Sequence, residues 1–191
     1  MTRTFFIPPG LGRVVIPPEA GDLPVPRYVD AFIRDAEDRA EDYDTDMAGG
    51  YFVPSDTRYF FQILQWLLEA GYLSRTGSFL EWGSGQGLAT MFAAMLGLTA
   101  VGVEIDARLV AEAKGLAARY GVSARFVHGS YDPDRPGPEI VTAKGYDVVH
   151  VYPWPGEEGR CLQLFEATAS PGALMMLCLG AEEIQLFRKP E

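Results

Sequence analysis

The chain has 191 residues, of which 48% are hydrophobic and 22% charged, and this length fits one globular domain with a terminal extension. Its formal net charge of −10 and the lack of any Lys/Arg run predict that nucleic acid and membrane surfaces are not partners, because both present negative charge. Two cysteines outside any metal-spaced cluster, no apolar run near the roughly 20 residues that span a bilayer and no signal peptide predict a cytoplasmic protein without a metal site.

The first fifty residues differ in composition from the rest. Residues 1–26 are rich in Pro and Gly, and we expect an extended arm there. Residues 27–42 combine spaced apolar positions with many charges, which predicts an exposed amphipathic helix. We therefore expect residues 1–50 to form an N-terminal arm and helix ahead of an α/β domain at 51–191. The arm would either close over a ligand site or complete the edge of a sheet.

From residue 56 onward, helix-like and strand-like patterns alternate. Residues 56–70 are apolar almost all round, which indicates a buried helix that ends at Gly71. Residues 131–145 form a Pro- and Gly-rich connection in a place where a helix could stand. The alternation predicts an α/β fold with a doubly wound, mostly parallel sheet. The expected strands are 78–82, 99–105, 124–128, 147–152, 173–179 and 183–187, and the later helices are 87–96, 107–120 and 158–169.

A glycine-rich loop joins the first of these strands to the following helix. Its sequence is Gly83-Ser84-Gly85-Gln86-Gly87, and glycine permits both a sharp turn and the close approach of a ligand to the backbone. Ligands of open α/β sheets bind at the carboxyl ends of the strands. Glu104 ends the second strand, from where a carboxylate can accept both hydroxyls of a ribose.

Three classes of ligand compete for such a loop. A dinucleotide fold needs a third glycine at position 88, which is Leu here, and a phosphate loop needs Gly-Lys-Ser/Thr, which the sequence lacks. A nucleoside ligand without a pyrophosphate remains.

The chain resembles the class I methyltransferases that depend on S-adenosylmethionine (SAM). Phe79-Leu-Glu-Trp-Gly-Ser-Gly-Gln-Gly87 is similar to their first motif, Val101-Gly-Val-Glu-Ile-Asp106 to the second, Phe126-Val-His-Gly-Ser130 to the third and Tyr146-Asp-Val-Val-His-Val-Tyr-Pro153 to the fourth. The resemblance covers about 78–180. It implies a Rossmann-like methyltransferase fold with an N-terminal helical extension and a shortened C-terminal end, a SAM-binding domain at 51–191, and SAM as cofactor.

The same resemblance implies roles for individual residues. An acid lies near the methionine ammonium, the loop glycines line methionine and ribose, a second acid binds the ribose diol, and the remaining contacts lie around the adenine and the methyl group. Residues 52–55 precede the helix that caps the methionine end. In that order, the implied cofactor-binding residues are Glu81; Gly83, Gly85 and Gly87; Glu104; Ile105, Ser130 and Tyr131 at the adenine; and Tyr152 beside the methyl group.

The sequence does not assign a catalytic residue. Methyl transfer from a sulfonium needs neither an acid nor a metal, and positioning supplies most of the rate. A base is required only when the acceptor must lose a proton. The candidates are Tyr152, His150 and Glu157, near the end of the fourth-motif strand, although His150 in its apolar strand is interpreted first as a satisfied core histidine. Asp106 is expected to cap the next helix.

We expect a SAM-dependent methyltransferase that acts on a small molecule or a protein side chain, and two alternatives stay open. The fourth motif reads Tyr152-Pro153-Trp154-Pro155, without the amide or carboxylate that holds an amine, and Ser130 stands where many members carry an acid. These departures and the short tail leave room for a non-catalytic SAM-binding module or subunit. The acid pair Glu157 and Glu158 leaves room for an aminopropyltransferase-like enzyme.

Overall fold

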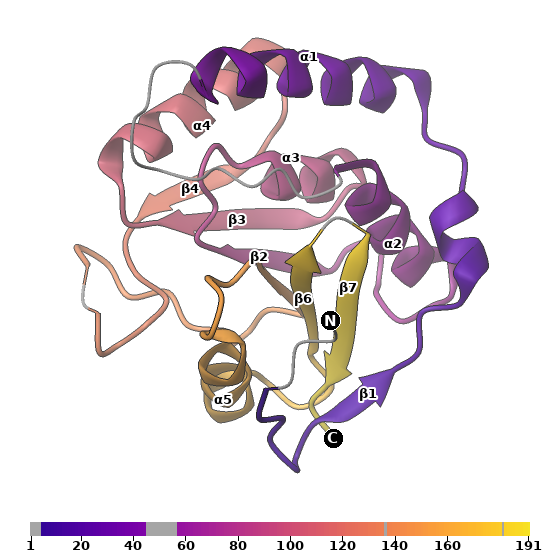
Figure 1. Cartoon of the computed structure of the whole chain (residues 1–191), viewed down its shortest axis with the longest axis vertical. Coiled ribbons are helices and arrows are strands. Elements are labelled where there is room, and N and C mark those ends of the chain that lie inside the picture. The colour runs from indigo at the N-terminus through magenta and orange to yellow at the C-terminus, as the bar shows by residue number, and fades with distance from the viewer. Residues whose placement is uncertain (1–4, 45–56, 136, 181) are drawn as a thin grey trace.

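One seven-stranded sheet organises the protein, which we describe from a computed structural model that covers residues 5–44, 57–135, 137–180 and 182–191 (Figure 1). The strand order is β1-β7-β6-β5-β2-β3-β4. Neighbours from β6 to β4 pair in parallel, whereas β7 pairs antiparallel with both β6 and β1. The strands are β1 (Gly12–Val14), β2 (Ser78–Trp82), β3 (Thr99–Glu104), β4 (Arg125–His128), β5 (Val148–Val151), β6 (Leu174–Gly180) and β7 (Glu183–Arg188).

Strands are added first on one side of β2 and then on the other. The chain runs through β3 and β4 on one side of β2, and returns to add β5, β6 and β7 on the opposite side. This reversal creates the topological switch at which doubly wound sheets open a crevice at their carboxyl edge. The helical elements are η1 (Pro18–Asp22), α1 (Arg27–Asp44), α2 (Thr57–Glu69), α3 (Leu88–Met95), α4 (Ala107–Tyr120) and α5 (Glu158–Thr168).

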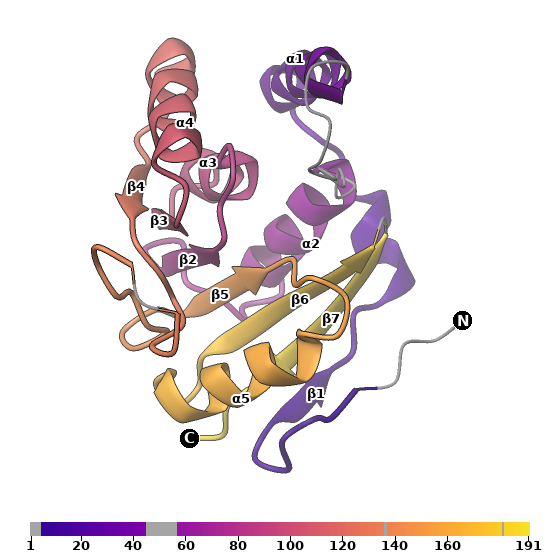
Figure 2. The same cartoon turned by 60° about the vertical axis from the view of Figure 1, so that its left-hand side comes forward.

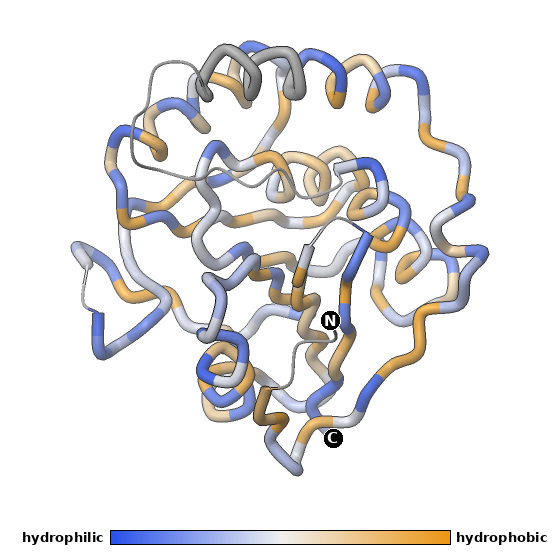
Figure 3. The backbone as a smooth tube through the Cα atoms, in the orientation of Figure 1, coloured by the Kyte–Doolittle hydropathy of each residue, from blue (hydrophilic) through white to orange (hydrophobic). Residues whose placement is uncertain are grey.

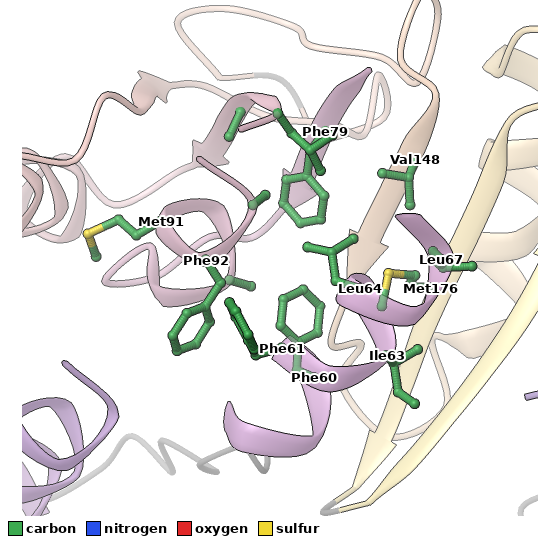
Figure 4. Close-up of a cluster of buried hydrophobic side chains, with 14 of the residues drawn as sticks. Phe60, Phe61, Ile63, Leu64, Leu67, Phe79, Met91, Phe92, Val148 and Met176 are labelled. Carbon is green, nitrogen blue, oxygen red and sulfur yellow. The ribbon is translucent and has the colours of Figure 1, made fainter. Parts of the chain in front are cut away.

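The two faces of the sheet are covered unequally (Figure 2). Successive strand side chains point to opposite faces, so Phe79 of β2 joins one core and Leu80 joins the other. Helices α1 to α4 supply the core on the Phe79 face. Figure 4 shows part of that core, with aromatic rings from α2, α3 and β2 close together. Helix α5 is the single described helix in the core on the Leu80 face.

The N-terminal arm wraps around one edge of the sheet. Phe5, Ile7 and Leu11 pack in the core on the α5 face, β1 then pairs with β7, and Ala20 of η1 is buried in the core on the opposite face. The arm therefore supplies the edge strand of the sheet and part of the cover that a further helix would otherwise give the α5 face. The expected division between residues 50 and 51 lies outside the described residues.

The expected α/β fold is confirmed, and helix α1 differs from its expected exposure. Its residues Val29, Phe32 and Ile33 are buried, and the Phe32 ring meets the rings of Phe92 and Tyr120 edge-on at 5.5 and 4.7 Å. The many charged residues led to the prediction of an exposed helix. Its narrow apolar stripe nevertheless packs against α3 and α4. Figure 3 shows hydrophobic residues concentrated along the central strands and α3.

Within the described ranges, no helix is both long enough and apolar enough to cross a membrane. The connection between β4 and β5 contains no helix in its described part, as its Pro and Gly content predicted.

Candidate functional site

The glycine loop lies at the carboxyl end of β2, where the sheet reverses its winding. Gly83, Gly85 and Gly87 have φ angles of 69°, 51° and 79°, a region that side chains other than glycine rarely enter. The N–H groups of Gly83 and Ser84 both donate to the carbonyl of Val103, each at 2.9 Å. The loop is thereby fixed to β3, and its three glycines are required by the backbone.

Two of these glycines also leave open space beside them. A Cβ atom built on Gly83 or Gly85 would meet no atom of the described chain within 4 Å, whereas one on Gly87 would lie 2.2 Å from the Phe126 ring. Gly87 therefore allows close packing of the loop on β4. Gly83 and Gly85 present their backbone to the open side of the loop, where a ligand could approach it.

Glu104 holds the loop from the end of β3. Its Oε2 accepts from the N–H of Gly85 at 2.9 Å, and its Oε1 accepts from the N–H groups of Ile105 and Asp106 at 2.7 and 2.9 Å. A carboxylate offers about four acceptor positions, so three are engaged and one on Oε2 remains. A ribose diol that took two hydrogen bonds would therefore have to replace one of these internal donors.

Asp106 caps α4, as expected. Its side chain accepts from the N–H of Arg108 at 2.7 Å and from that of Leu109 at 3.4 Å. The side chain between the two acids, Ile105, is 55% exposed. An exposed apolar side chain beside the carboxylate of Glu104 suits the flank of an adenine ring, and that role stays a prediction.

Glu81 is buried on the α2–α3 face of β2. Its Oε2 accepts from both the N–H and the hydroxyl of Thr90, at 2.9 and 2.5 Å. Its Oε1 lies 3.6 Å from Nδ1 of His150, which is directly opposite in the β2–β5 register. His150 is buried as expected, but within the described chain neither of its ring nitrogens has a hydrogen-bond partner. The prediction that His150 is a core histidine with satisfied hydrogen bonds is therefore correct about its burial and wrong about its hydrogen bonds.

Ser130 and Tyr131 are engaged in internal contacts. The Ser130 hydroxyl donates to the carbonyl of Asp132 at 3.1 Å and accepts from its N–H at 3.0 Å. The Tyr131 ring stacks on Trp82 at 4.9 Å, and burial raises the pKa of its phenol well above the usual range. These contacts fix both residues beside the carboxyl edge, and their contact with an adenine stays a prediction.

The loop after β5 carries the catalytic candidates Tyr152 and Glu157. Tyr152 is half-buried, and Trp154 is 62% exposed. Glu157 forms an ion pair with Arg135 at 2.8 Å, and the buried Glu158 accepts from the N–H of Gly156. Because both acids are engaged, the acid pair gives little support to the polyamine pocket that an aminopropyltransferase needs.

The sequence reasoning missed an ion-pair cluster that fixes the loop after β4. Arg160 of α5 donates to both oxygens of the buried Asp132, at 2.9 and 2.7 Å, and to the exposed Asp134 at 2.8 Å. The hydrogen bonds from Arg160 hold the pKa of Asp132 below its usual value. Acids in a Pro-rich loop follow no periodic pattern that would indicate a buried partner. The one signal in the sequence was that Asp132 and Asp134 stand two residues apart, close enough to share a partner.

Comparison with known proteins identifies the fold. No protein-family model matches the chain, and no curated protein is similar to it in sequence. An RNA methyltransferase from Salinibacter ruber, solved with S-adenosyl-L-homocysteine, superposes with a TM-score of 0.53 at 23% identity, over 68% of this chain and 91% of that one. A T. thermophilus 16S rRNA methyltransferase, solved with AdoMet (SAM) and guanosine, gives 0.55 at 19% identity, over 76% of this chain and 45% of that one. The chain therefore has the Rossmann-like fold of SAM-dependent methyltransferases.

These two RNA methyltransferases overturn the prediction that nucleic acid is not a partner. That prediction was drawn from the net charge of −10, which sums over the whole chain. A net charge does not describe the charge at any one surface, so it cannot exclude a class of partner.

Proposed function

We propose that this protein is a SAM-dependent methyltransferase. One observation carries the proposal: Gly83 and Gly85 leave their backbone open at the carboxyl edge of the sheet, with the carboxylate of Glu104 hydrogen-bonded beside them. The fold supports it, as does the product or cofactor bound in the two similar structures. The residues around the loop also fit a nucleoside ligand, because one acceptor position of Glu104 is left for a ribose hydroxyl and Ile105 is exposed next to it.

Under this proposal the chain mainly binds and orients its ligands. SAM supplies a methyl group that is activated by the positive charge on its sulfur. Gly83 and Gly85 would contact it through the backbone, Glu104 would hold the ribose, Ile105 would flank the adenine, and Glu81 would face the positively charged end. Holding two reactants in line can contribute about 7–11 kcal/mol to catalysis, and the departing thioether needs no proton.

We infer that the methyl acceptor enters beside the loop that follows β5. Trp154 is 62% exposed there, and the half-buried Tyr152 lies two residues before it. An exposed indole can stack on an apolar or cationic acceptor. We propose a small molecule or a protein side chain as acceptor, and the test below includes RNA because two proteins of this fold modify it.

Calorimetric titration tests cofactor binding. We expect saturable binding of SAM and S-adenosylhomocysteine by the wild-type protein. Gly85→Ala should weaken that binding at least about tenfold, because a side chain fills the open face of the loop. Gly121→Ala is the matched control: Gly121 also has a positive φ of 63°, and a Cβ atom built on it would meet nothing within 4 Å, but it ends α4. Both variants should lose about 1–2 kcal/mol of stability from backbone strain, and only the first should lose affinity. No binding of either ligand to the wild type contradicts the proposal.

Transfer of a labelled methyl group tests turnover. The protein is incubated with labelled SAM and separate pools of small molecules, proteins and RNA, and label is counted in each pool. Transfer to one pool assigns the acceptor class. SAM binding without transfer to any pool supports the non-catalytic binding module, and tighter binding of decarboxylated SAM supports the aminopropyltransferase.

A further inference from the structure

Glu81 and His150 form a buried polar pair at the inner end of the proposed cofactor site. They lie side by side on β2 and β5, each one residue before its strand ends. Glu81 is 7% exposed and His150 3% exposed. Trp82 and Gly83 follow Glu81 directly, so the pair lies at the end of the strands that leads into the glycine loop.

The surroundings of His150 favour an apolar side chain. Its ring lies 4.6 Å from that of Phe60 and 6.3 Å from that of Phe79, two of the rings drawn in Figure 4. Within the described chain, both ring nitrogens lack hydrogen-bond partners. Burying an unsatisfied donor and acceptor destabilises a fold, whereas an apolar residue of similar size would not. We therefore expect the histidine to lower stability relative to an apolar residue at this position, and such a cost points to a role in ligand binding.

The two oxygens of Glu81 are in different situations. Oε2 receives both hydrogen bonds from Thr90, which fix the carboxylate on α3. Oε1 faces Nδ1 of His150 at 3.6 Å, just beyond the roughly 2.7–3.2 Å of an N–H···O hydrogen bond. A small rotation of either side chain would close that distance.

We propose that His150 is a positioning residue, whose Nδ1–H donates to Oε1 of Glu81 when ligand binds and holds the carboxylate toward the positively charged end of SAM. The inference rests on the proposed function, because it needs a cationic ligand above Glu81. The chemistry is complementary: SAM carries an ammonium and a sulfonium, and Glu81 is a buried carboxylate one residue from the end of the strand that leads into the loop. His150 acts through Glu81 and need not touch the ligand.

Two substitutions at position 150 separate positioning from packing. His150→Leu keeps the side chain apolar and close in size, so the denaturation midpoint should stay equal to that of the wild type or rise. Its affinity for SAM should fall at least about tenfold, or about 1.4 kcal/mol. His150→Asn keeps an N–H donor near the position of Nδ1, and its affinity should stay within about threefold of the wild type.

A double-mutant cycle tests whether His150 acts through Glu81. Glu81→Gln alone should weaken SAM binding, and adding His150→Leu to it should produce little further loss, since the carboxylate to be held is gone. Additive losses contradict the inference, as does wild-type affinity in His150→Leu. An affinity loss in His150→Asn equal to that in His150→Leu also contradicts it. Failure of the wild type to bind SAM overturns the proposed function itself and so is a distinct result.

Discussion

Glu104 is bound to the protein at three backbone N–H groups before any ligand arrives. A residue expected to serve only the ribose therefore also holds the glycine loop against β3. With one acceptor position left on Oε2, a ribose diol that takes two hydrogen bonds must replace one of the three backbone donors, and ligand binding is then coupled to the stability of the loop.

Glu104→Gln should weaken SAM binding and lower stability together. The amide keeps the shape but loses the charge and one acceptor, and a hydrogen bond to a charged group contributes about 1.5–3 kcal/mol. We expect SAM affinity to fall at least about tenfold by calorimetry, and the free energy of unfolding to fall by about 1–2 kcal/mol in denaturant titrations.

The control for this variant is Asp106→Asn, two residues along the same turn. Asparagine caps helices about as well as aspartate, so stability should change by a few tenths of a kcal/mol at most and SAM affinity should not change. Unchanged SAM affinity in Glu104→Gln would leave Glu104 as a structural residue of the loop alone.

Residues of one type with the same local pattern cannot be separated from sequence alone. Gly83 and Gly87 look equivalent in the motif, but the Phe126 ring, which belongs to a distant strand, packs against Gly87 only. His128 and His150 both follow apolar residues, but His128 is exposed and bonds the carbonyl of Ile105, whereas His150 is buried without a partner. The difference comes from long-range packing, which one sequence does not display.

At the scale of elements, periodic patterns predicted most of the fold. The central strands and the helices α2 to α5 were expected within a few residues, because apolar spacing and glycine stops act locally. The three-residue strand β1 lies in a segment predicted to be extended, and completing the edge of the sheet was one of the two roles left open for it, without a partner strand. A strand so short carries no periodic signal, and its partner lies at the other end of the sequence.

Leu11 should anchor the N-terminal arm. It is 8% exposed in the core on the α5 face, whereas Val15, just past β1, is 82% exposed. Leu11→Ala should lower the free energy of unfolding by about 2–5 kcal/mol through lost burial and a residual cavity. The control Val15→Ala should change it by no more than about 0.5 kcal/mol. If Leu11→Ala lowered the free energy of unfolding in denaturant titrations by no more than Val15→Ala does, Leu11 would not anchor the arm in the core.

The ion-pair cluster between the β4–β5 loop and α5 should make stability depend on acid pH. The pKa of Asp132 is lowered from 3.8, mainly by its hydrogen bonds with Arg160. A depressed pKa contributes stability that is full above 3.8 and is lost as the pH falls through the lowered value. Asp132→Asn should therefore have a lower denaturation midpoint than the wild type at pH 7, and the gap should shrink below pH 3.8.

Asp134→Asn is the matched control for this cluster, since Asp134 bonds the same arginine but its side chain is 81% exposed. Exposed ion pairs contribute little, so its midpoint should stay close to that of the wild type at both pH values. A gap for Asp132→Asn that stays constant from pH 7 to below pH 3.8 would contradict the assignment of the depressed pKa to this residue.

At the scale of the whole molecule, the unequal cover of the two faces follows from what the chain omits. The described part of the connection between β4 and β5 has no helix, and β7 begins at Glu183, soon after β6 ends at Gly180. The arm compensates by placing Phe5, Ile7 and Leu11 on the α5 face. A segment that precedes the central strands in the sequence thus completes both the edge of the sheet and the cover of its α5 face.

The pairing of β1 with β7 has a consequence for folding during synthesis on the ribosome. Gly12 is synthesised well before its partner Arg188, which belongs to the strand of the sheet that comes last in the sequence. At roughly 5–20 residues per second, the N-terminal strand waits on the order of ten seconds for that partner. Meanwhile Phe5, Ile7 and Leu11 have no finished surface to bury them, and the nascent arm is open to chaperones until the sheet closes.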